Sequence, residues 1–432
     1  MSAPSCFLAP RPASHPRPGA ACPAPRARLS ARFPGERIVV PAGELRVRSN
    51  DCDHRFRPHS AYAWLTGLTG EDQAGHALIL EPAGAHAHEA VLYLRPRSPR
   101  TGRGFYQDRR YGEFWVGRRP DLAEAERMTG IRCVPLHPEA ALPPGRDAAG
   151  DPELAAVLGE LRLVKDAREV GELQRAVDHT AAGFEDVTRA LPRALAHPRG
   201  ERWIEGVFGL RARAEGNGTG YETIAASGAH ACVLHWIRND GPLDRRDLLL
   251  LDAGVETDSL YTADITRTLP LSGRFSPVQR QVYELVLAAQ DAGIAALKPG
   301  ARFRDFHRAA MRVIAEGLVE WGVLGGADGD LHRRYTLCSS GHMLGLDVHD
   351  CAQARADAYL DGVLEEGQVL TVEPGLYLQP DDETLPRALR GIGVRIEDDL
   401  VITAEGARLI SDALPRAADD VEAWRGALLD GA

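Results

Sequence analysis

Two aspartates within an apolar stretch place the tightest constraint on how this chain can fold. Residues 248–268 read LLLLDAGVETDSLYTADITRT, with Asp252 directly after four leucines and Asp264 further along the same stretch. The leucine run predicts a buried first strand, which argues against an ordinary exposed hairpin with scattered acids. If the strands join around residues 256–258, with residue 256 opposite residue 260, the two aspartates pair directly on one face, with Cβ atoms ~4.5–5.5 Å apart. Carboxylates so close in a partly apolar sheet need a proton or a cation between them.

Two further acids stand at the ends of predicted strands downstream. In GQVLTVEPGLYL, Glu373 follows an apolar run, and the Pro-Gly pair after it ends the strand. In GIGVRIEDDLVIT, Arg395 and Glu397 share one face of a single predicted strand. We therefore expect Glu397 to point away from the core, with Arg395 beside it to orient carboxylates. Each acid alone is typical of an edge strand, but together they indicate a site.

A histidine completes a set of metal-binding side chains. A lone histidine is more often structural than a ligand, but in SSGHMLGLDVHD the glycines on either side of His342 allow close backbone approach, which favours a ligand loop. Two divalent cations would balance the charges of the four carboxylates and this imidazole: Asp252, Asp264, Glu373, Glu397 and His342. Such a donor set favours Mn²⁺, with Co²⁺ or Zn²⁺ possible in vitro. Two cations ~3.5–4 Å apart can share a water, lower its pKa and polarise a carbonyl, which is hydrolase chemistry.

The length of 432 residues predicts two domains of unequal size. Residues 1–30 are rich in Pro, Ala and Arg without a single acid, so we expect a disordered arm, or a start codon placed too far upstream. Residues 31–160 alternate short apolar runs (ERIVVPAG, HALILEP, AVLYLRP) with helical stretches, which predicts a small α/β domain. Residues 161–420 predict an α+β domain with a mostly antiparallel sheet covered by helices, and residues 421–432 a tail.

Charge and cysteine usage exclude several classes of protein. The net charge of -10 and the pI near 5.9 argue against nucleic acid as a partner. No run approaches the roughly 20 apolar residues of a membrane span. The seven cysteines are odd in number and without CxxC spacing, which is typical of a reducing cytoplasm rather than a disulfide framework.

The order of the motifs DAG, ADITRT, GHMLGLDVHD, TVEPGLYL and GIGVRIED resembles the dinuclear metallopeptidases of the pita-bread fold, and most of all the Xaa-Pro aminopeptidases (aminopeptidase P). The resemblance covers residues 165–420. The first domain is similar to the amino-terminal domain of this branch through VRSNDCDHRFRPHSAYAWLTG (Val47–Gly67) and GEFWVGRRP (Gly112–Pro120). Fold and function are then expected to follow: a curved antiparallel sheet under helices, and hydrolysis of the bond between an N-terminal residue and a penultimate proline by a hydroxide that bridges the two metals.

The resemblance also assigns roles to the metal-binding set. It implies that Asp252 chelates one metal, that Asp264 and Glu397 bridge both, and that His342 and Glu373 complete the other. Glu373 would also handle the proton of the bridging hydroxide.

Further residues match positions around the substrate. The resemblance implies that His235 stabilises the tetrahedral intermediate, that His349 contacts substrate, and that Tyr377 and Arg395 stand behind the ligands. Relatives are commonly dimers or tetramers, and Trp115 is either a contact to a neighbouring subunit or a core residue.

Alternatives remain within the same fold. A prolidase that cuts only Xaa-Pro dipeptides would keep every metal ligand, and noncatalytic pita-bread proteins lose ligands that are all present here. The chain also departs from the usual pattern. The interval from Asp252 to Asp264 is one residue longer, and Cys338 stands where many relatives have a histidine.

Overall fold

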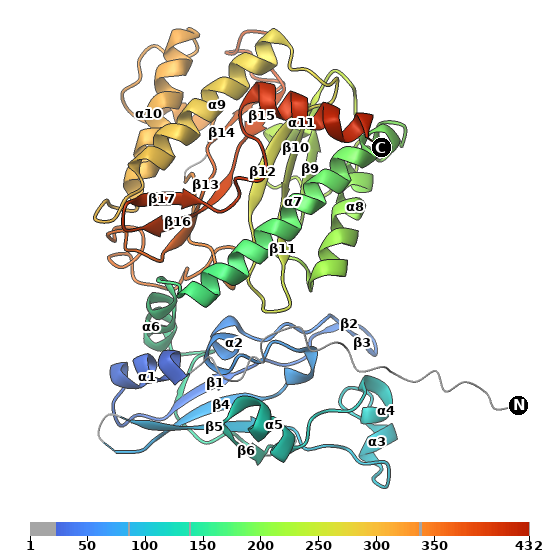
Figure 1. The fold of residues 1–432 in the computed structure, drawn as a ribbon, viewed down its shortest axis with the longest axis vertical. Coiled ribbons are helices and arrows are strands. Elements are labelled where there is room, and N and C mark those ends of the chain that lie inside the picture. The colour runs from blue at the N-terminus through green and yellow to red at the C-terminus, as the bar shows by residue number, and fades with distance from the viewer. Residues whose placement is uncertain (1–22, 85–86, 138–139, 337–338, 432) are drawn as a thin grey trace, which may run out of the picture. The chain divides into compact units, whose positions relative to one another are not determined.

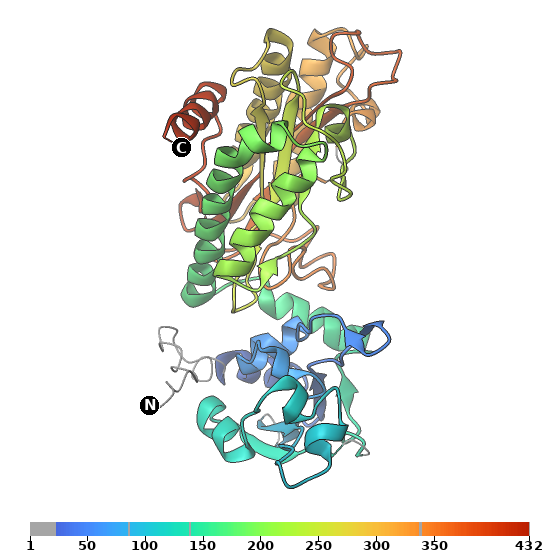
Figure 2. The same cartoon turned by 90° about the vertical axis from the view of Figure 1, so that its right-hand side faces the viewer.

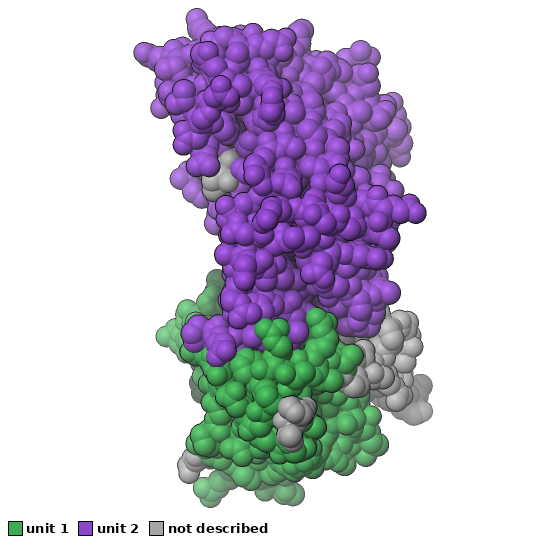
Figure 3. All heavy atoms as spheres, turned by 90° about the vertical axis from the view of Figure 1, so that its left-hand side faces the viewer, with its two compact units in different colours: residues 1–151 green, residues 152–432 purple. Residues whose placement is uncertain are grey.

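The computed structural model describes residues 23–84, 87–137, 140–336 and 339–431, and Figure 1 shows its elements. The chain divides into two compact units, residues 1–151 and residues 152–432, coloured separately in Figure 3. The division falls before the expected boundary at residue 160, because helix α6 (Pro152–Arg162) groups with the second unit. No helix in the described ranges has the length and apolar character of a membrane span.

The first unit is the expected small α/β domain. Its sheet has the strand order β6-β5-β4-β1-β7, with an antiparallel centre and β6 and β7 parallel to their neighbours. The central strand β4 is buried because its apolar run reads ALIL without a polar interruption. The elements are α1 (Pro23–Arg32), β1 (Ile38–Pro41), β2 (Val47–Ser49), β3 (Cys52–Asp53), α2 (Ser60–Thr66), β4 (Ala77–Pro82), β5 (His88–Leu94), α3 (Gly104–Gln107), α4 (Glu113–Val116), α5 (Leu122–Thr129), β6 (Arg132–Pro135) and β7 (Arg146–Asp147), with a 3-10 turn at Glu71–Gln73.

The second unit repeats one arrangement twice. A pair of long helices precedes short antiparallel strands in each half, and Figures 1 and 2 show α7 beside α8 and α9 beside α10. Every strand pair described in this unit is antiparallel, as expected. The elements are α7 (Ala167–Leu195), α8 (Gly200–Glu215), β8 (Gly218–Thr219), β9 (Ile224–Ser227), β10 (Leu248–Ala253), β11 (Val255–Glu256), β12 (Ile265–Pro270), α9 (Pro277–Ala296), α10 (Arg304–Glu320), β13 (Val369–Val372), β14 (Gly375–Leu378), β15 (Ile392–Arg395), β16 (Asp398–Thr403), β17 (Gly406–Leu409) and α11 (Ala418–Asp430), with 3-10 turns at Gly228–Cys232 and Leu331–Arg334.

Two terminal segments contain helices, so the expected disorder is wrong for residues 23–30, and the segment expected as a tail belongs to a packed helix. Within residues 1–30, α1 begins at Pro23, because Ala, Arg and Leu favour helix, a proline is tolerated in the first turn, and Leu29 is fully buried. Residues 1–22 lie outside the described part. The supposed tail from residue 421 is α11, whose residues Ala418 and Val421 are buried in the core that also includes α9. Their spacing of three residues is a helical face that a short segment shows weakly.

The aspartates lie on one face of the β10–β12 pair, but in a different register from the one expected. Asp252 pairs with Thr266, and Glu256 forms a bridge with Thr262, so Asp264 lies diagonal to Asp252. The connection at residues 257–261 is longer than expected, with Thr257 N donating to Tyr261 O. A slip of two residues moves the direct partner but preserves the face, because side chains alternate with a period of two.

The segment expected as one strand, residues 391–403, is two strands. β15 ends at Arg395 and β16 begins at Asp398, so Glu397 lies at the break between them. Glu397 is 1% exposed, so it points into the protein and not away from the core as expected. A buried acid is tolerated here because Arg395 and other polar groups surround it.

The loop that carries the histidines of the GHMLGLDVHD motif is anchored by a buried ion pair. Asp350 accepts hydrogen bonds from Arg162 Nη2 at 2.7 Å and from Lys165 Nζ at 3.0 Å. Burial of Asp350 opposes its charged form, but the Arg162 and Lys165 charges outweigh it and lower the pKa of Asp350 to about 2. The ordinary pKa of an aspartate in an unfolded chain is about 3.9.

This ion pair predicts a loss of stability in acid. Because the folded pKa is the lower one, the contribution is fully present above about pH 4 and is lost as the pH falls towards 2. We expect the difference in unfolding free energy between the protein and Asp350→Asn to shrink by about 1.2 kcal/mol between pH 5 and pH 3. Urea unfolding at each pH measures it. Arg162→Met removes one of the two charges that lower the pKa of Asp350, so the unfolding free energy of this variant should depend less on pH in this range. A difference between the protein and Asp350→Asn that stays constant with pH would contradict the assignment.

Candidate metal centre

Five side chains predicted as ligands reach the second unit's interior from strand ends and one loop. Asp252 lies near the end of β10, Asp264 directly before β12, Glu373 directly after β13, and Glu397 between β15 and β16. His342 lies in the loop before β13. Strand ends are suited to this role because the backbone stops pairing there while its neighbours keep it fixed.

Three of the five converge as a metal site requires. One ligand atom from each of Asp264, His342 and Glu397 lies within 4.8 Å of the others. His342 Nε2 lies 3.3 Å from Asp264 Oδ2 and 3.5 Å from Glu373 Oε1, so Glu373 adjoins the same cluster. The structure therefore brings three of the four predicted carboxylates around the imidazole of His342.

Asp252 joins the cluster through the hydroxyl of Tyr221. This hydroxyl lies 2.6 Å from Asp252 Oδ1 and 2.5 Å from Asp264 Oδ1. One hydroxyl proton can be donated to only one of the two carboxylates, so the other oxygen faces a lone pair. The remaining oxygen of Asp252 accepts from Arg395 Nη2. Tyr221 was not predicted as a site residue, because nothing in its local sequence marks it.

The backbone around His342 fixes which ring nitrogen is available. Nδ1 lies 3.2 Å from the Met343 carbonyl oxygen, which can only accept, so Nδ1 carries a proton and Nε2 is the ring nitrogen that faces the carboxylates and would bind a cation through its lone pair. Gly341 permits this loop to lie against β13, since a Cβ at that position would lie 2.2 Å from Thr371 O. His342 N donates to the Thr371 hydroxyl at 3.1 Å, which anchors the loop to the strand.

The carboxylates of the cluster are largely buried, and their negative charge is not balanced by the groups around them. Glu397 Oε2 accepts from the Thr266 hydroxyl at 2.7 Å, while Glu397 Oε1 is buried and has no hydrogen-bond partner among the described residues. Burial, and next the charges of Asp264 and Glu373, raise the pKa of Glu397 well above its ordinary value. Burial and neighbouring acids also raise the pKa of Asp264, and that of Glu373 to about 7. Oxygen donors with an orphaned carboxylate oxygen and one free imidazole nitrogen fit divalent cations.

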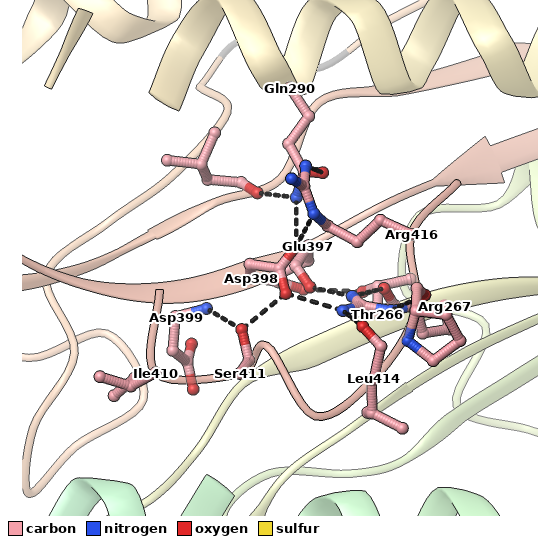
Figure 4. Close-up of polar contacts among 12 residues, drawn as sticks. Thr266, Arg267, Gln290, Glu397, Asp398, Asp399, Ile410, Ser411, Leu414 and Arg416 are labelled. Atoms are coloured by element: carbon pink, nitrogen blue, oxygen red, sulfur yellow. Dashed lines mark hydrogen bonds and ion pairs between the residues drawn. The ribbon is translucent and has the colours of Figure 1, made fainter. Parts of the chain in front are cut away.

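A network beneath the cluster positions two of the acids (Figure 4). Asp398 accepts from Arg267 Nη2 at 2.7 Å, Ser411 Oγ at 2.6 Å and Gln290 Nε2 at 2.9 Å. Arg267 Nη1 also donates to the backbone oxygen of Glu397 at 2.6 Å, and Gln290 Nε2 to that of Val372 at 3.1 Å. Asp398 therefore fixes Arg267, which holds the backbone at Glu397, and Gln290, which holds the backbone at Val372, directly before Glu373.

The other predicted site residues lie at varying distances from the cluster. Arg395 is buried, with Nε donating to the Thr266 hydroxyl at 3.1 Å and Nη1 to the Tyr377 hydroxyl at 2.9 Å. His349 is exposed, with its ring 4.4 Å from the His342 ring. His235 is exposed and hydrogen-bonds none of the predicted ligands. Burial, then the His342 charge and more weakly the His235 charge, lower the pKa of His349.

Three residues of this centre were not predicted from the sequence: Tyr221, Thr266 and Asp399. Of these, Thr266 could have been predicted. Thr266 shares a strand face with Asp264 by the period of two, and it bonds both Glu397 and Arg395. Asp399, whose Oδ2 accepts from Asp264 N at 3.1 Å, follows Glu397 without any distinguishing pattern. Cys338, the position noted in the sequence as a departure from the usual pattern, lies outside the described residues.

Comparisons with known proteins match both units of the chain. Residues 171–404 match the profile of metallopeptidase family M24, and residues 24–139 that of the aminopeptidase P N-terminal domain. Xaa-Pro aminopeptidase 1 of Streptomyces coelicolor is 54% identical over 430 residues, which span 93% of this chain and 86% of that protein.

Solved structures agree. Aminopeptidase PepP of Pseudomonas aeruginosa superposes with a TM-score of 0.78 at 31% identity, covering 94% of this chain and 98% of that one. A zinc-substituted aminopeptidase P of Escherichia coli in complex with product has a TM-score of 0.79 at 28% identity with the same coverage.

Proposed function

Since the chain belongs to metallopeptidase family M24 and carries the aminopeptidase P N-terminal domain, we propose that it is a metal-dependent aminopeptidase that removes the first residue from peptides with proline in second position. The observation that carries the proposal is the cluster of Asp264, His342 and Glu397, with Glu373 beside it and a buried carboxylate oxygen left without a partner. The similarity to Xaa-Pro aminopeptidase 1 supports the choice of substrate.

The proposed ligands are the five side chains named from the sequence: Asp252, Asp264, His342, Glu373 and Glu397. When bound, two divalent cations would lower the pKa of a water and polarise the scissile carbonyl. Manganese is the metal we propose from the carboxylate-rich donors. Metal analysis of protein purified from its own cells tests this, and a predominance of zinc would contradict it.

The side chains have distinct proposed tasks around the peptide. Glu373 accepts and returns the proton of the attacking water, a task that suits a carboxylate at the edge of the cluster with its side chain 18% exposed. His235 and His349 are exposed imidazoles and are proposed to contact the substrate. Arg395 orients Asp252, and the Tyr377 hydroxyl accepts a hydrogen bond from Arg395.

We further propose a cytoplasmic homodimer or homotetramer. Cys52, Cys133, Cys232 and Cys351 are free, which agrees with a reducing compartment. Helix α4 exposes three adjacent apolar side chains, and Trp115 among them is 51% exposed, so its alternative as a core residue is wrong. Such a patch is typical of a protein interface. Sedimentation of the purified protein tests the state, and a monomer at micromolar concentration would contradict it.

The aminopeptidase proposal predicts a preference that separates it from a prolidase. Manganese-loaded protein should cleave Xaa-Pro-Yaa tripeptides with a kcat/KM at least about 10-fold above that for the matching Xaa-Pro dipeptides, because the aminopeptidase site must admit chain beyond proline. Release of the first residue, measured by chromatography, gives both values. The matching Xaa-Ala-Yaa tripeptide is the control and should be a poor substrate. Activity confined to dipeptides would convert the assignment to prolidase, and no activity on either would leave a binding protein.

A further inference from the structure

The first unit buries an arginine that has no counter-ion. Arg119 lies between α4 and α5 and is 7% exposed. Its Nη2 donates to the Pro96 carbonyl oxygen at 3.2 Å, whereas its Nε has no hydrogen-bond partner. Among the described residues, no carboxylate lies within ion-pairing distance of this guanidinium. An unpaired buried cation is unfavourable, so the fold retains a charge for which the chain supplies no partner.

The acids nearest to Arg119 are engaged elsewhere or exposed. Both carboxylate oxygens of Glu113 accept from Arg97, each at 2.9 Å. Asp72 is exposed. Burial lowers the pKa of Arg119. The negative charge of Glu113 raises this pKa, and the positive charge of Arg95 lowers it, so the pKa stays below its ordinary value. Arg95 also has a buried Nε without a partner, although its Nη2 forms an ion pair with the exposed Glu44 at 3.6 Å.

Both arginines line one cavity of about 230 Å³ within this unit. Its lining also includes the apolar side chains of Leu94, Ala125 and Met128. Leu94 and Ala125 are buried, whereas Met128 is 50% exposed, so the cavity has an apolar interior and an open rim. An engineered apolar cavity of about 150 Å³ holds a benzene molecule, so this one accommodates a molecule of six to nine heavy atoms.

His76 adds a hydrogen-bond acceptor to the same cavity. Its Nδ1 lies 3.2 Å from Gln73 Oε1, which already accepts from the Tyr62 hydroxyl, so Nδ1 carries the proton. His76 Nε2 is buried without a partner. Burial and the charges of Arg119 and Arg95 lower the pKa of His76 to about 3, so the ring is neutral near pH 7. A ligand with a donor group near its acid group would satisfy this nitrogen.

We propose that the cavity binds a small carboxylate with an apolar body, whose carboxylate pairs with Arg119 and Arg95. The carboxylate supplies the missing charge, and the apolar body fills the space between Leu94, Ala125 and Met128. The unpaired acceptor His76 Nε2 favours free amino acids as the ligands, because their ammonium group can donate a hydrogen bond to it. The proposal does not depend on the peptidase activity, because the cavity lies wholly within residues 67–129.

Calorimetric titration of the full-length, metal-loaded protein with 4-methylpentanoate, leucine and inorganic phosphate tests the proposal. Arg119→Met should weaken binding of both carboxylates by about 10- to 100-fold, the effect of losing charge-assisted hydrogen bonds. Its matched control is Arg118→Met, which removes the neighbouring arginine that pairs with Glu124 at the surface and should leave binding unchanged. Because Arg119→Met removes an unpaired charge, its melting temperature should not fall.

Each outcome bears on the proposal. Binding that depends on Arg119 supports it, with tighter binding of leucine identifying free amino acids as the source and tighter binding of 4-methylpentanoate identifying other carboxylic acids. If Arg119→Met does not fold, Arg95→Met is titrated in its place, because Arg95 lines the same cavity. Failure of both carboxylates to bind, or equally tight binding of phosphate, overturns the proposal. Persistence of this binding in the variant Asp264→Asn shows that the cavity and the metal centre are independent.

Discussion

Replacing Asp264 by Asn is expected to abolish peptide cleavage and to remove bound metal together. Asp264 is central to the cluster, with Oδ2 3.3 Å from His342 Nε2 and Oδ1 beside the Tyr221 hydroxyl. The amide has no charge and presents a nitrogen that cannot bind a cation. We expect turnover to fall by on the order of 10⁴-fold, since both the proton transfer and the charge stabilisation at the scissile bond depend on the centre. Elemental analysis after dialysis against manganese measures the stoichiometry, and an Xaa-Pro tripeptide assay measures turnover.

The metal-free forms show whether the loss is local. Removing one of several crowded charges relieves repulsion, so metal-free Asp264→Asn should unfold at the same or a higher urea concentration than the metal-free protein. The control is Asp258→Asn, the same substitution at an exposed position of the β11–β12 connection, which should keep both metal and activity. His235→Ala should lower turnover while metal stays bound. Unchanged turnover in Asp264→Asn would contradict the ligand assignment.

Replacing Asp398 by Asn is expected to give the largest loss of stability. Arg267 is 1% exposed, and Asp398 is its only carboxylate partner in the described part of the chain. The substitution leaves this guanidinium buried with no counter-charge, a change that costs about 3–5 kcal/mol. A corresponding fall in melting temperature on the order of 5–10 °C is expected for a unit of this size. Thermal and guanidinium unfolding of the metal-free protein measure it.

The matched control removes another partner of the same network at the surface. Asp291 pairs with Arg416 at 2.8 Å and its side chain is 58% exposed. Asp291→Asn should therefore change the unfolding free energy by only about 0–1 kcal/mol. Because Asp398 and Arg267 hold the backbone of Glu397, we also expect Asp398→Asn to bind metal more weakly. Equal stability of the two variants would show that Arg267 is stabilised by its four backbone acceptors alone.

The predicted strand register was wrong, but the prediction that the two aspartates share one face of the strand pair does not depend on it. Asp252 was expected opposite Asp264, but it pairs with Thr266. The shift is an even number of residues, so both aspartates still lie on one face. The same alternation places Arg395 and Glu397 together across a break between two strands. Local periodicity was therefore sufficient to group the acids, although it could not give their distances.

Partners from distant segments could not be predicted in this way. Tyr221 reaches Asp252 and Asp264 from the segment before β9, and Asp399 reaches Asp264 N from another sheet. Neither contact has a local signature, because each depends on how separate sheets pack. The helices α1 and α11 were missed for a related reason, since short segments become helical when a few of their apolar side chains find a buried place.

The amino-acid sequence by itself indicated the kind of chemistry. It places four carboxylates at the ends of predicted strands and a histidine in a glycine-rich loop, and its motif order is that of one family. The tertiary structure decided the burial, orientation and hydrogen-bond partners of these groups. It set the register through the length of one connection, oriented the His342 ring through the Met343 carbonyl, and left one oxygen of Glu397 buried without a partner. It also left Arg119 without a counter-ion in the other unit. Burial and pairing are properties of packing between distant segments, and packing is not written in any local pattern of residues.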